Sequence, residues 1–222
     1  MSGRRPEVVL FDLDGTLIDS APDLAGAAND LRALHGLPPL PYEQLRPMVG
    51  AGARGMVGIA FDRKPGDADY DELRTAFLTR YAERMLEATR VFDEMLPVLD
   101  ALEAAGLRWG IVTNKVLSLA HPIVAGLGLH ERAAVLVAGD STPYAKPHPE
   151  PLFEAARRIA AAPTDCVYVG DDLRDIQAGR AAGMAVLAAA WGYLGQGEPV
   201  HAWGADAVAD RPAGLLKWLD LA

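Results

Sequence analysis

Six short apolar runs recur along the chain, most of them bounded by turn or polar residues. They cover residues 7–12, 107–114, 133–140, 166–171, 184–192 and 205–210. None alternates cleanly between apolar and polar positions, which is typical of strands buried on both faces of a parallel sheet. Between the later runs lie helical segments at 97–105, 150–162 and 172–182. Strands that alternate with helices through short connections predict an α/β fold with a doubly wound parallel sheet.

The stretch between residues 20 and 91 departs from this alternation, because its pattern is helical throughout and contains no convincing strand. Residues 24–36 and 70–88 are amphipathic, and the Pro-rich LPPLPY and Gly-rich VGAGARGMVG lie between them. We therefore expect an all-helical cap domain at 18–92, inserted after the first strand, and an α/β core at 1–17 and 93–222. Ligands of open α/β sheets bind beyond the carboxyl ends of the strands, so the insertion is placed to act as a lid.

The composition narrows the class of partner. The 222 residues carry a formal net charge of -9, from 30 acidic and 21 basic residues. This balance argues against nucleic acid or an anionic membrane as partner, but not against a small phosphorylated metabolite. No apolar stretch reaches the roughly 20 residues of a membrane-spanning helix, and the N-terminal run is too short for a signal peptide. With a single cysteine, Cys166, the chain forms no intrachain disulfide, so we expect a cytoplasmic protein.

Polar residues of chemical interest follow four of the apolar runs. They are Asp12 and Asp14 after the first, Thr113, Asn114 and Lys115 after the second, Lys146 after the third, and Asp171, Asp172 and Asp175 after the fourth. Because the carboxyl ends of parallel strands share one edge of a sheet, we expect these side chains to converge. The acidic residues suit Mg²⁺, a hard cation that takes oxygen ligands. One carboxylate is then available to attack phosphorus while a second moves the proton of the leaving group.

Each of these signals has a plainer interpretation when it is taken alone. In Asp12-Leu13-Asp14-Gly15 the glycine is the fourth residue, whereas an EF-hand loop needs it at the sixth. Asp171 or Asp172 alone is equally well explained as a turn starter or a helix cap. Thr-Asn or Lys-Pro after a strand is common at turns and surfaces. The joint occurrence of the four groups, in this order and each at a strand end, favours a phosphoryl-transfer site.

The segments FDLDGTLIDS, IVTNK, KPHPEPL and VGDDLRDIQAGRAAGM resemble the four motifs of the haloacid dehalogenase-like hydrolase superfamily, over nearly the whole chain. The resemblance is closest to its phosphoglycolate-phosphatase-like branch. It implies a Rossmann-like catalytic core with a helical cap after the first motif. It also implies a Mg²⁺-dependent phosphatase that forms an aspartyl-phosphate. In this interpretation Asp12 is the nucleophile, Asp14 is the general acid/base, and Lys146 stabilises both the nucleophile and the phosphate.

The same resemblance assigns the remaining site residues. Thr113 and Asn114 would hold the phosphoryl oxygens. The Mg²⁺ ligands would be Asp12, the backbone carbonyl of Asp14, and Asp171. Asp172 and Asp175 would support the metal.

The substrate is expected to reach the cap as well as the core. Arg54 is the cation of VGAGARGMVG, which resembles the cap loop that approaches the substrate, and arginine suits a carboxylate or phosphate. Two substrates stay open, 2-phosphoglycolate and N-acetylmuramic acid 6-phosphate. GARGMVGIAF and WGADAVADRP resemble the phosphatases of the second compound. Asp93-Glu94 stands where phosphoglycolate phosphatases often carry Pro-Gly.

Two other functions compete with the phosphatase interpretation. A sugar-phosphate mutase of the same superfamily uses the same nucleophile and acid/base pair. A non-catalytic scaffold would be expected to lack at least one of Asp12, Asp14, Lys146 and Asp171, and all of them are present. We expect a monomer or a homodimer.

Overall fold

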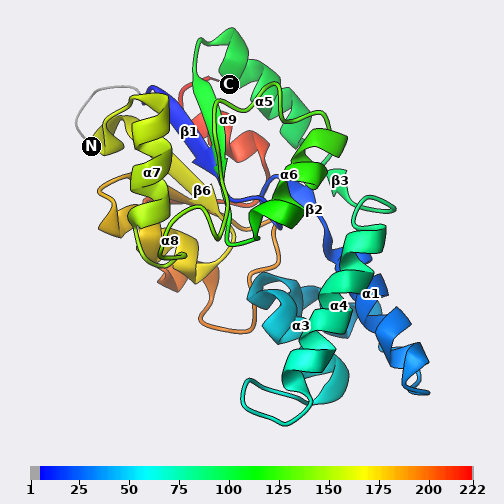
Figure 1. Cartoon of the computed structure of the whole chain (residues 1–222). Coiled ribbons are helices and arrows are strands. Elements are labelled where there is room, and N and C mark those ends of the chain that lie inside the picture. The colour runs from blue at the N-terminus through cyan, green and yellow to red at the C-terminus, as the bar shows by residue number, and fades with distance from the viewer. Residues whose placement is uncertain (1–5, 222) are drawn as a thin grey trace.

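A six-stranded parallel sheet forms the centre of the computed structural model, which describes residues 6–221 (Figure 1). Its spatial order is β5-β4-β1-β6-β7-β8. The strands are β1 (Val8–Phe11), β4 (Arg108–Val112), β5 (Leu136–Val137), β6 (Cys166–Gly170), β7 (Ala185–Ala189) and β8 (Ala207–Ala209). Each lies inside one of the six predicted runs. The order is that of a Rossmann-like doubly wound sheet, so the predicted fold class is confirmed.

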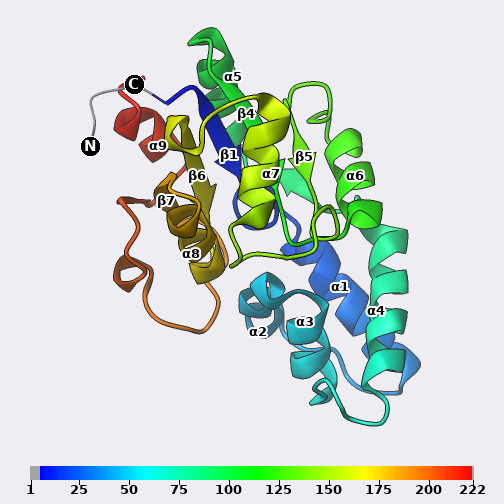
Figure 2. The ribbon, with the colours of Figure 1, turned by 60° about the vertical axis from the view of Figure 1, so that its left-hand side comes forward.

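Helices cover both faces of this sheet. Along β1, Val9 and Phe11 pack on one face and Val8 and Leu10 on the other, because successive residues of a strand point to opposite sides. The first face is covered by α5 (Met95–Ala104), α6 (Leu117–Gly126) and α9 (Ala213–Trp218). The second is covered by α7 (Glu150–Ile159) and α8 (Leu173–Ala181), which Figure 2 shows in front of the sheet. Burial on both faces explains why the strand sequences lack alternation.

The remaining helices gather beyond the carboxyl ends of the strands (Figure 1). They are α1 (Ala21–Leu34), α2 (Tyr42–Leu45), the 3₁₀ helix η1 (Arg46–Ala51), α3 (Gly52–Phe61) and α4 (Tyr70–Arg84). Helix α1 packs against both α3 and α4. The proposed domain boundaries at 17/18 and 92/93 stay a prediction, and residues 1–5 lie outside the described part of the chain.

Two details of this region differ from the sequence-based expectation. First, β2 (Ile18–Asp19) and β3 (Arg90–Val91) form an antiparallel pair, although no strand was expected near residue 91. Two-residue strands are too short to produce a periodic pattern. Second, the Gly-rich run is largely η1 and the start of α3 rather than a loop. At Gly55 a β-carbon would lie 2.5 Å from that of Ala51, so the glycine permits close packing of α3 on η1.

The chain is anchored where it enters and leaves this helical region. Asp23, buried in α1, accepts hydrogen bonds from the backbone N–H groups of Ala88 and Thr89 and from the Thr89 hydroxyl, at 2.7–3.1 Å. At the entry side, the Tyr193 hydroxyl of the core accepts hydrogen bonds from the N–H groups of Ser20 and Ala21. No helix within residues 6–221 has the length and apolar character needed to cross a bilayer.

Replacing Asp23 by alanine is expected to reduce the free energy of unfolding by about 3 kcal/mol, because buried donors are left without a partner. Chemical denaturation monitored by circular dichroism measures this change. Asp30→Ala is the matched control, since Asp30 is exposed and pairs with Arg84 on the same pair of helices. It should cost less than about 1 kcal/mol. Equal effects of the two substitutions would contradict the anchoring role of Asp23.

Candidate active site

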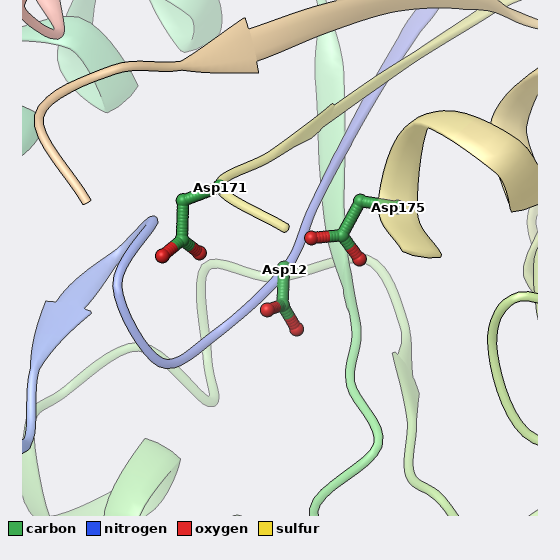
Figure 3. Close-up of side chains that lie close together, drawn as sticks. All are labelled: Asp12, Asp171 and Asp175. Carbon is green, nitrogen blue, oxygen red and sulfur yellow. The ribbon is translucent and has the colours of Figure 1, made fainter. Parts of the chain in front are cut away.

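Three carboxylates meet where the direction of strand order reverses in the sheet. Asp12 follows β1, Asp171 follows the adjacent parallel strand β6, and Asp175 lies in the first turn of α8 (Figure 3). One oxygen from each lies within 4.8 Å of the others. The reversal point between β1 and β6 is where doubly wound sheets place their ligands, so this group occupies the expected binding position.

Burial makes the negative charge of this group costly. It raises the pKa of Asp12 to about 7, an effect that the neighbouring Lys146 opposes. Burial, together with the charges of Asp12 and Asp175, also raises the pKa of Asp171 well above its ordinary value. Such shifts mean that the protein alone does not fully offset the cost of negative charge on these carboxylates.

Lys146 supplies the positive charge inside the group. Its Nζ lies 2.8 Å from Oδ1 of Asp12 and 2.7 Å from Oδ1 of Asp175. Burial alone would lower the pKa of Lys146, but the two carboxylates more than offset this effect and the pKa is raised. The side chain of Asn114 bonds to both the N–H and the carbonyl of Lys146, each at 2.9 Å, and so fixes the segment that carries this lysine.

Asp171 is held on both of its oxygens. The hydroxyl of Thr16 donates to Oδ1 at 3.0 Å, and the backbone N–H of Tyr193 donates to Oδ2 at 2.7 Å. Gly15, with φ of +84°, passes so close that a β-carbon there would lie 2.2 Å from Oδ2 of Asp171. The glycine that follows Asp14 therefore allows the first loop to lie against the carboxylate group.

The side chain of Asp14 points into a different set of contacts. Its Oδ1 accepts hydrogen bonds from the Ser20 hydroxyl and from Nζ of Lys115, the latter at 2.8 Å. The same Nζ lies 2.8 Å from the hydroxyl of Tyr81 on α4. Burial alone would lower the pKa of Lys115, but Asp14 and Tyr81 more than offset it, so the pKa is raised and the ammonium persists.

A cavity of about 370 Å³ joins these groups to the helical region. Asp12, Asp14, Thr113, Lys115 and Lys146 line it from the core. Leu24, Val49, Arg74, Phe77 and Tyr81 are among the residues that line its other side. The cavity thus combines the three-carboxylate group, two largely buried lysines and an apolar wall.

Comparison with known proteins identifies the family. Residues 6–183 match the model of the haloacid dehalogenase-like hydrolases. The chain belongs to this family. It is 43% identical over 223 residues to an N-acetylmuramic acid 6-phosphate phosphatase of Pseudomonas aeruginosa, covering 100% of this chain and 98% of the relative. It is 48% identical over 215 residues to a phosphoglycolate phosphatase of Xanthomonas campestris pv. campestris, covering 96% of both.

A solved structure agrees with these relatives. The crystal structure of a predicted phosphoglycolate phosphatase from Haemophilus somnus superposes with a TM-score of 0.85 at 28% identity, covering 98% of this chain and 99% of that one. The predicted resemblance to haloacid dehalogenase-like hydrolases is thus confirmed, and so is the predicted enzyme class, a phosphatase.

Within this haloacid dehalogenase-like hydrolase, the three-carboxylate group fits a hard divalent cation, because all its donors are oxygens and because burial, together with neighbouring charges, raises the pKa of Asp12 and of Asp171. Asp12 and Asp171 were predicted as ligands and lie in the group. Asp175 was predicted in a supporting role and also lies in it. The predicted ligation by the backbone carbonyl of Asp14 stays a prediction.

Other predicted residues have contacts of their own. Asp172 caps α8 by accepting from the N–H of Arg174, and its carboxylate pairs with the Arg174 side chain at 2.7 Å. The helix-cap interpretation therefore describes Asp172 well. Thr113 lines the cavity, and its hydroxyl accepts from the N–H of Lys115 at 3.1 Å.

Arg54 does not line the cavity that contains the acidic group. It lines a second cavity of about 680 Å³, between α3 and the segment at residues 194–198. Arg74 on α4 is instead the cation that the described residues of the helical region contribute to the cavity containing Asp12 and Asp14. The sequence signal for Arg74 was only its place in an amphipathic helix, which does not reveal what that helix faces.

Binding of a divalent cation is expected to compete with protons at Asp12. In the folded chain Asp12 keeps a proton up to about pH 7, whereas its ordinary pKa is 3.8. The metal-free protein should therefore lose stability as the pH rises between these values, because the folded state binds more protons than the unfolded state. Cation binding needs the deprotonated carboxylate, so MgCl₂ should raise the unfolding temperature more at about pH 8 than at about pH 6.

Thermal unfolding with MgCl₂ or EDTA at the two pH values measures this effect. Asp171→Asn should remove the cation-induced rise. An equal rise at both pH values, or a rise retained in Asp171→Asn, would contradict the assignment of the group as a cation site.

Proposed function

We propose that this chain is a Mg²⁺-dependent phosphomonoesterase that hydrolyses a small phosphorylated metabolite bearing a carboxylate. The observation that carries the proposal is the position of Asp12, which lies in the carboxylate group, 2.8 Å from Lys146, and in the same cavity as Asp14. A nucleophile, a charge-neutralising lysine and a separate acid/base are thereby available to one phosphate.

The proposed reaction has two steps on residues of this chain. A carboxylate oxygen of Asp12 attacks phosphorus and the bond to the substrate oxygen breaks, while Asp14 donates its proton to that oxygen. Asp14 then accepts a proton from a water molecule, whose oxygen attacks the aspartyl-phosphate. Inorganic phosphate leaves and the carboxylate of Asp12 is restored. Lys146 balances the charge on Asp12 and the phosphoryl oxygens throughout.

Mg²⁺ would be held by Asp12, Asp171 and Asp175, with the backbone carbonyl of Asp14 as a further proposed ligand. When bound, it supplies positive charge that offsets the phosphoryl oxygens and lowers the repulsion between nucleophile and phosphate. Thr113 is placed at the cavity wall to donate to a phosphoryl oxygen. The side chain of Asn114 acts through Lys146, whose backbone it holds.

The helical region at 18–92 is proposed to be the cap that selects the substrate. Its contribution to the cavity is mostly apolar, with Leu24, Val49 and Phe77 among the lining residues. A cavity of about 370 Å³ lies in the range that holds ligands of drug-like size. These features favour N-acetylmuramic acid 6-phosphate, whose sugar ring, N-acetyl group and lactyl ether can contact the apolar wall, over the two-carbon 2-phosphoglycolate.

Arg74 is proposed to bind the carboxylate of the substrate. The other cations that line the cavity are each paired with an aspartate, namely Lys115 with Asp14, Lys146 with Asp12 and Arg174 with Asp172. Arg74 pairs with no carboxylate of residues 6–221. Its guanidinium is therefore available for a second anionic group on the substrate.

Phosphate release from 2-phosphoglycolate and N-acetylmuramic acid 6-phosphate, measured side by side with MgCl₂ and with EDTA, tests the proposed function. Turnover should require MgCl₂ and be faster with the sugar phosphate. Asp12→Asn should keep the fold and lose at least about 10⁴-fold in kcat, because the nucleophile is removed. Asp210→Asn, at an exposed aspartate after β8, is the control and should retain activity. Mg²⁺-dependent turnover by Asp12→Asn would refute the nucleophile assignment.

Arg74→Gln is expected to raise KM for the carboxylate-bearing substrate about tenfold or more, the scale of one lost charge-assisted contact. Turnover of p-nitrophenyl phosphate, which has no carboxylate, should change little. Arg54→Gln provides a matched control in the second cavity and should affect neither substrate. The reverse pattern, with Arg54 setting KM, would mean that the cap loop binds the carboxylate after all.

A further inference from the structure

The carboxylate of Asp14 is bound on one oxygen and free on the other. Lys115 and Ser20 both donate to Oδ1, and Oδ2 accepts no hydrogen bond from residues 6–221. Only 18% of the Asp14 side chain is exposed, and the residue lines the catalytic cavity. The two bonds to Oδ1 restrict rotation of the carboxylate and leave Oδ2 as the oxygen available to a ligand.

Lys115 connects this carboxylate to the helical region. Its ammonium lies between Asp14 of the first loop and the hydroxyl of Tyr81 on α4, at 2.8 Å from each. The Tyr81 ring is buried, and its centroid lies 4.6 Å from Nζ. Since 8% of the Lys115 side chain is exposed, little water competes for these contacts. A single cation thus ties the position of Asp14 to the docked position of α4.

We propose that Lys115 is the positioning residue for Asp14, holding Oδ1 so that Oδ2 meets the leaving-group oxygen when α4 is docked. This inference rests on the proposed function, in which Asp14 protonates that oxygen. In the first step the bond between phosphorus and the substrate oxygen breaks, and the proton on Oδ2 of Asp14 passes to that oxygen. The product leaves as an alcohol, and Asp14 becomes a carboxylate paired with Lys115.

Comparing substrates with different leaving groups tests this role of Lys115 without any pH measurement. An alkoxide is a strong base and leaves poorly unless it is protonated, whereas p-nitrophenolate leaves readily without a proton. General acid catalysis contributes roughly 10²- to 10⁴-fold to such steps. Loss of a residue that acts through Asp14 should therefore slow departure of the leaving group far more for alkyl phosphates than for p-nitrophenyl phosphate.

Lys115→Met is the decisive variant, because it keeps the length of the side chain and removes the ammonium. In single-turnover measurements, which follow the first step before the aspartyl-phosphate is hydrolysed, we expect release of the alcohol from the alkyl phosphate, N-acetylmuramic acid 6-phosphate or 2-phosphoglycolate, to slow about 100-fold. Release of p-nitrophenolate from p-nitrophenyl phosphate should slow less than about threefold. Lys115→Arg should restore part of the loss. Tyr81→Phe, which keeps the ring and removes the hydroxyl, should show the same selectivity to a smaller degree.

Controls separate this inference from the proposed function. Lys217→Met, at an exposed lysine of α9, should leave both activities unchanged. Asp14→Asn should show the same leaving-group selectivity as Lys115→Met, and adding Lys115→Met to it should cause no further selective loss. If Asp14→Asn slows release of the leaving group equally for both substrates in a single turnover, the acid role of Asp14 fails and the proposed function must change.

Other outcomes overturn the role of Lys115 alone. If Asp14→Asn is selective but a folded Lys115→Met slows release of the leaving group equally for both substrates, Lys115 serves only the structure. If Lys115→Met raises KM only for the carboxylate-bearing substrate and spares kcat, the lysine binds substrate instead. Circular dichroism and thermal unfolding establish that the variant is folded. Should Lys115→Met fail to fold, Lys115→Arg and Tyr81→Phe carry the same test, and a uniform loss in both would overturn the proposal.

Discussion

The mutual repulsion of buried carboxylates is the constraint on which this structure depends. Asp12, Asp171 and Asp175 bring oxygens within 4.8 Å of one another in a region with little access to water. Burial, and after it the like charges at such distances, favours the uptake of protons, as the raised pKa values of Asp12 and Asp171 indicate. The fold keeps them together by rigid means: adjacent parallel strands, a helix start, and one buried lysine. The resulting site is unbalanced toward negative charge, which is the condition for attracting a cation and then an anionic phosphate.

The motif after β6 distributes three aspartates over three different tasks. Asp171 joins the carboxylate group and is fixed by Thr16 and Tyr193. Asp172 caps α8 and pairs with Arg174. Asp175 belongs to both arrangements, since one oxygen accepts from the backbone of Asp172 and the other pairs with Lys146. The helix cap is thus part of the active-site geometry, because it sets where the Asp175 carboxylate lies.

Much of this arrangement follows from local sequence. The six apolar runs locate the strands of the sheet, and the strand ends identify Asp12 and Asp171, because a parallel sheet brings such ends to one edge. Lys146 lies in the loop between β5 and α7, and the side chain of Asn114 holds its backbone. What local sequence lacks is the face that each element presents to another. The Gly-rich run becomes helical through packing of α3 on η1, which overrides its weak helix propensity. Arg54 and Arg74 both lie in the helical region, and only the packing of α3 and α4 decides which one lines the cavity with Asp12 and Asp14. Lys115 directly follows Asn114 in the sequence, but its partners lie in the first loop and on α4.

The short pair of β2 and β3 has a consequence for how such an enzyme can diversify. Ile18 pairs with Val91 and Asp19 with Arg90, so the chain crosses into the helical region and back to the core at the same place. Everything between these two crossings can be lengthened, shortened or exchanged while the strand ends that carry Asp12 and Asp171 keep their spacing. The inserted helices nevertheless contact the machinery of the core, because Tyr81 on α4 bonds Lys115. Any change in this stretch must therefore leave a partner for Lys115, whose ammonium also holds Asp14.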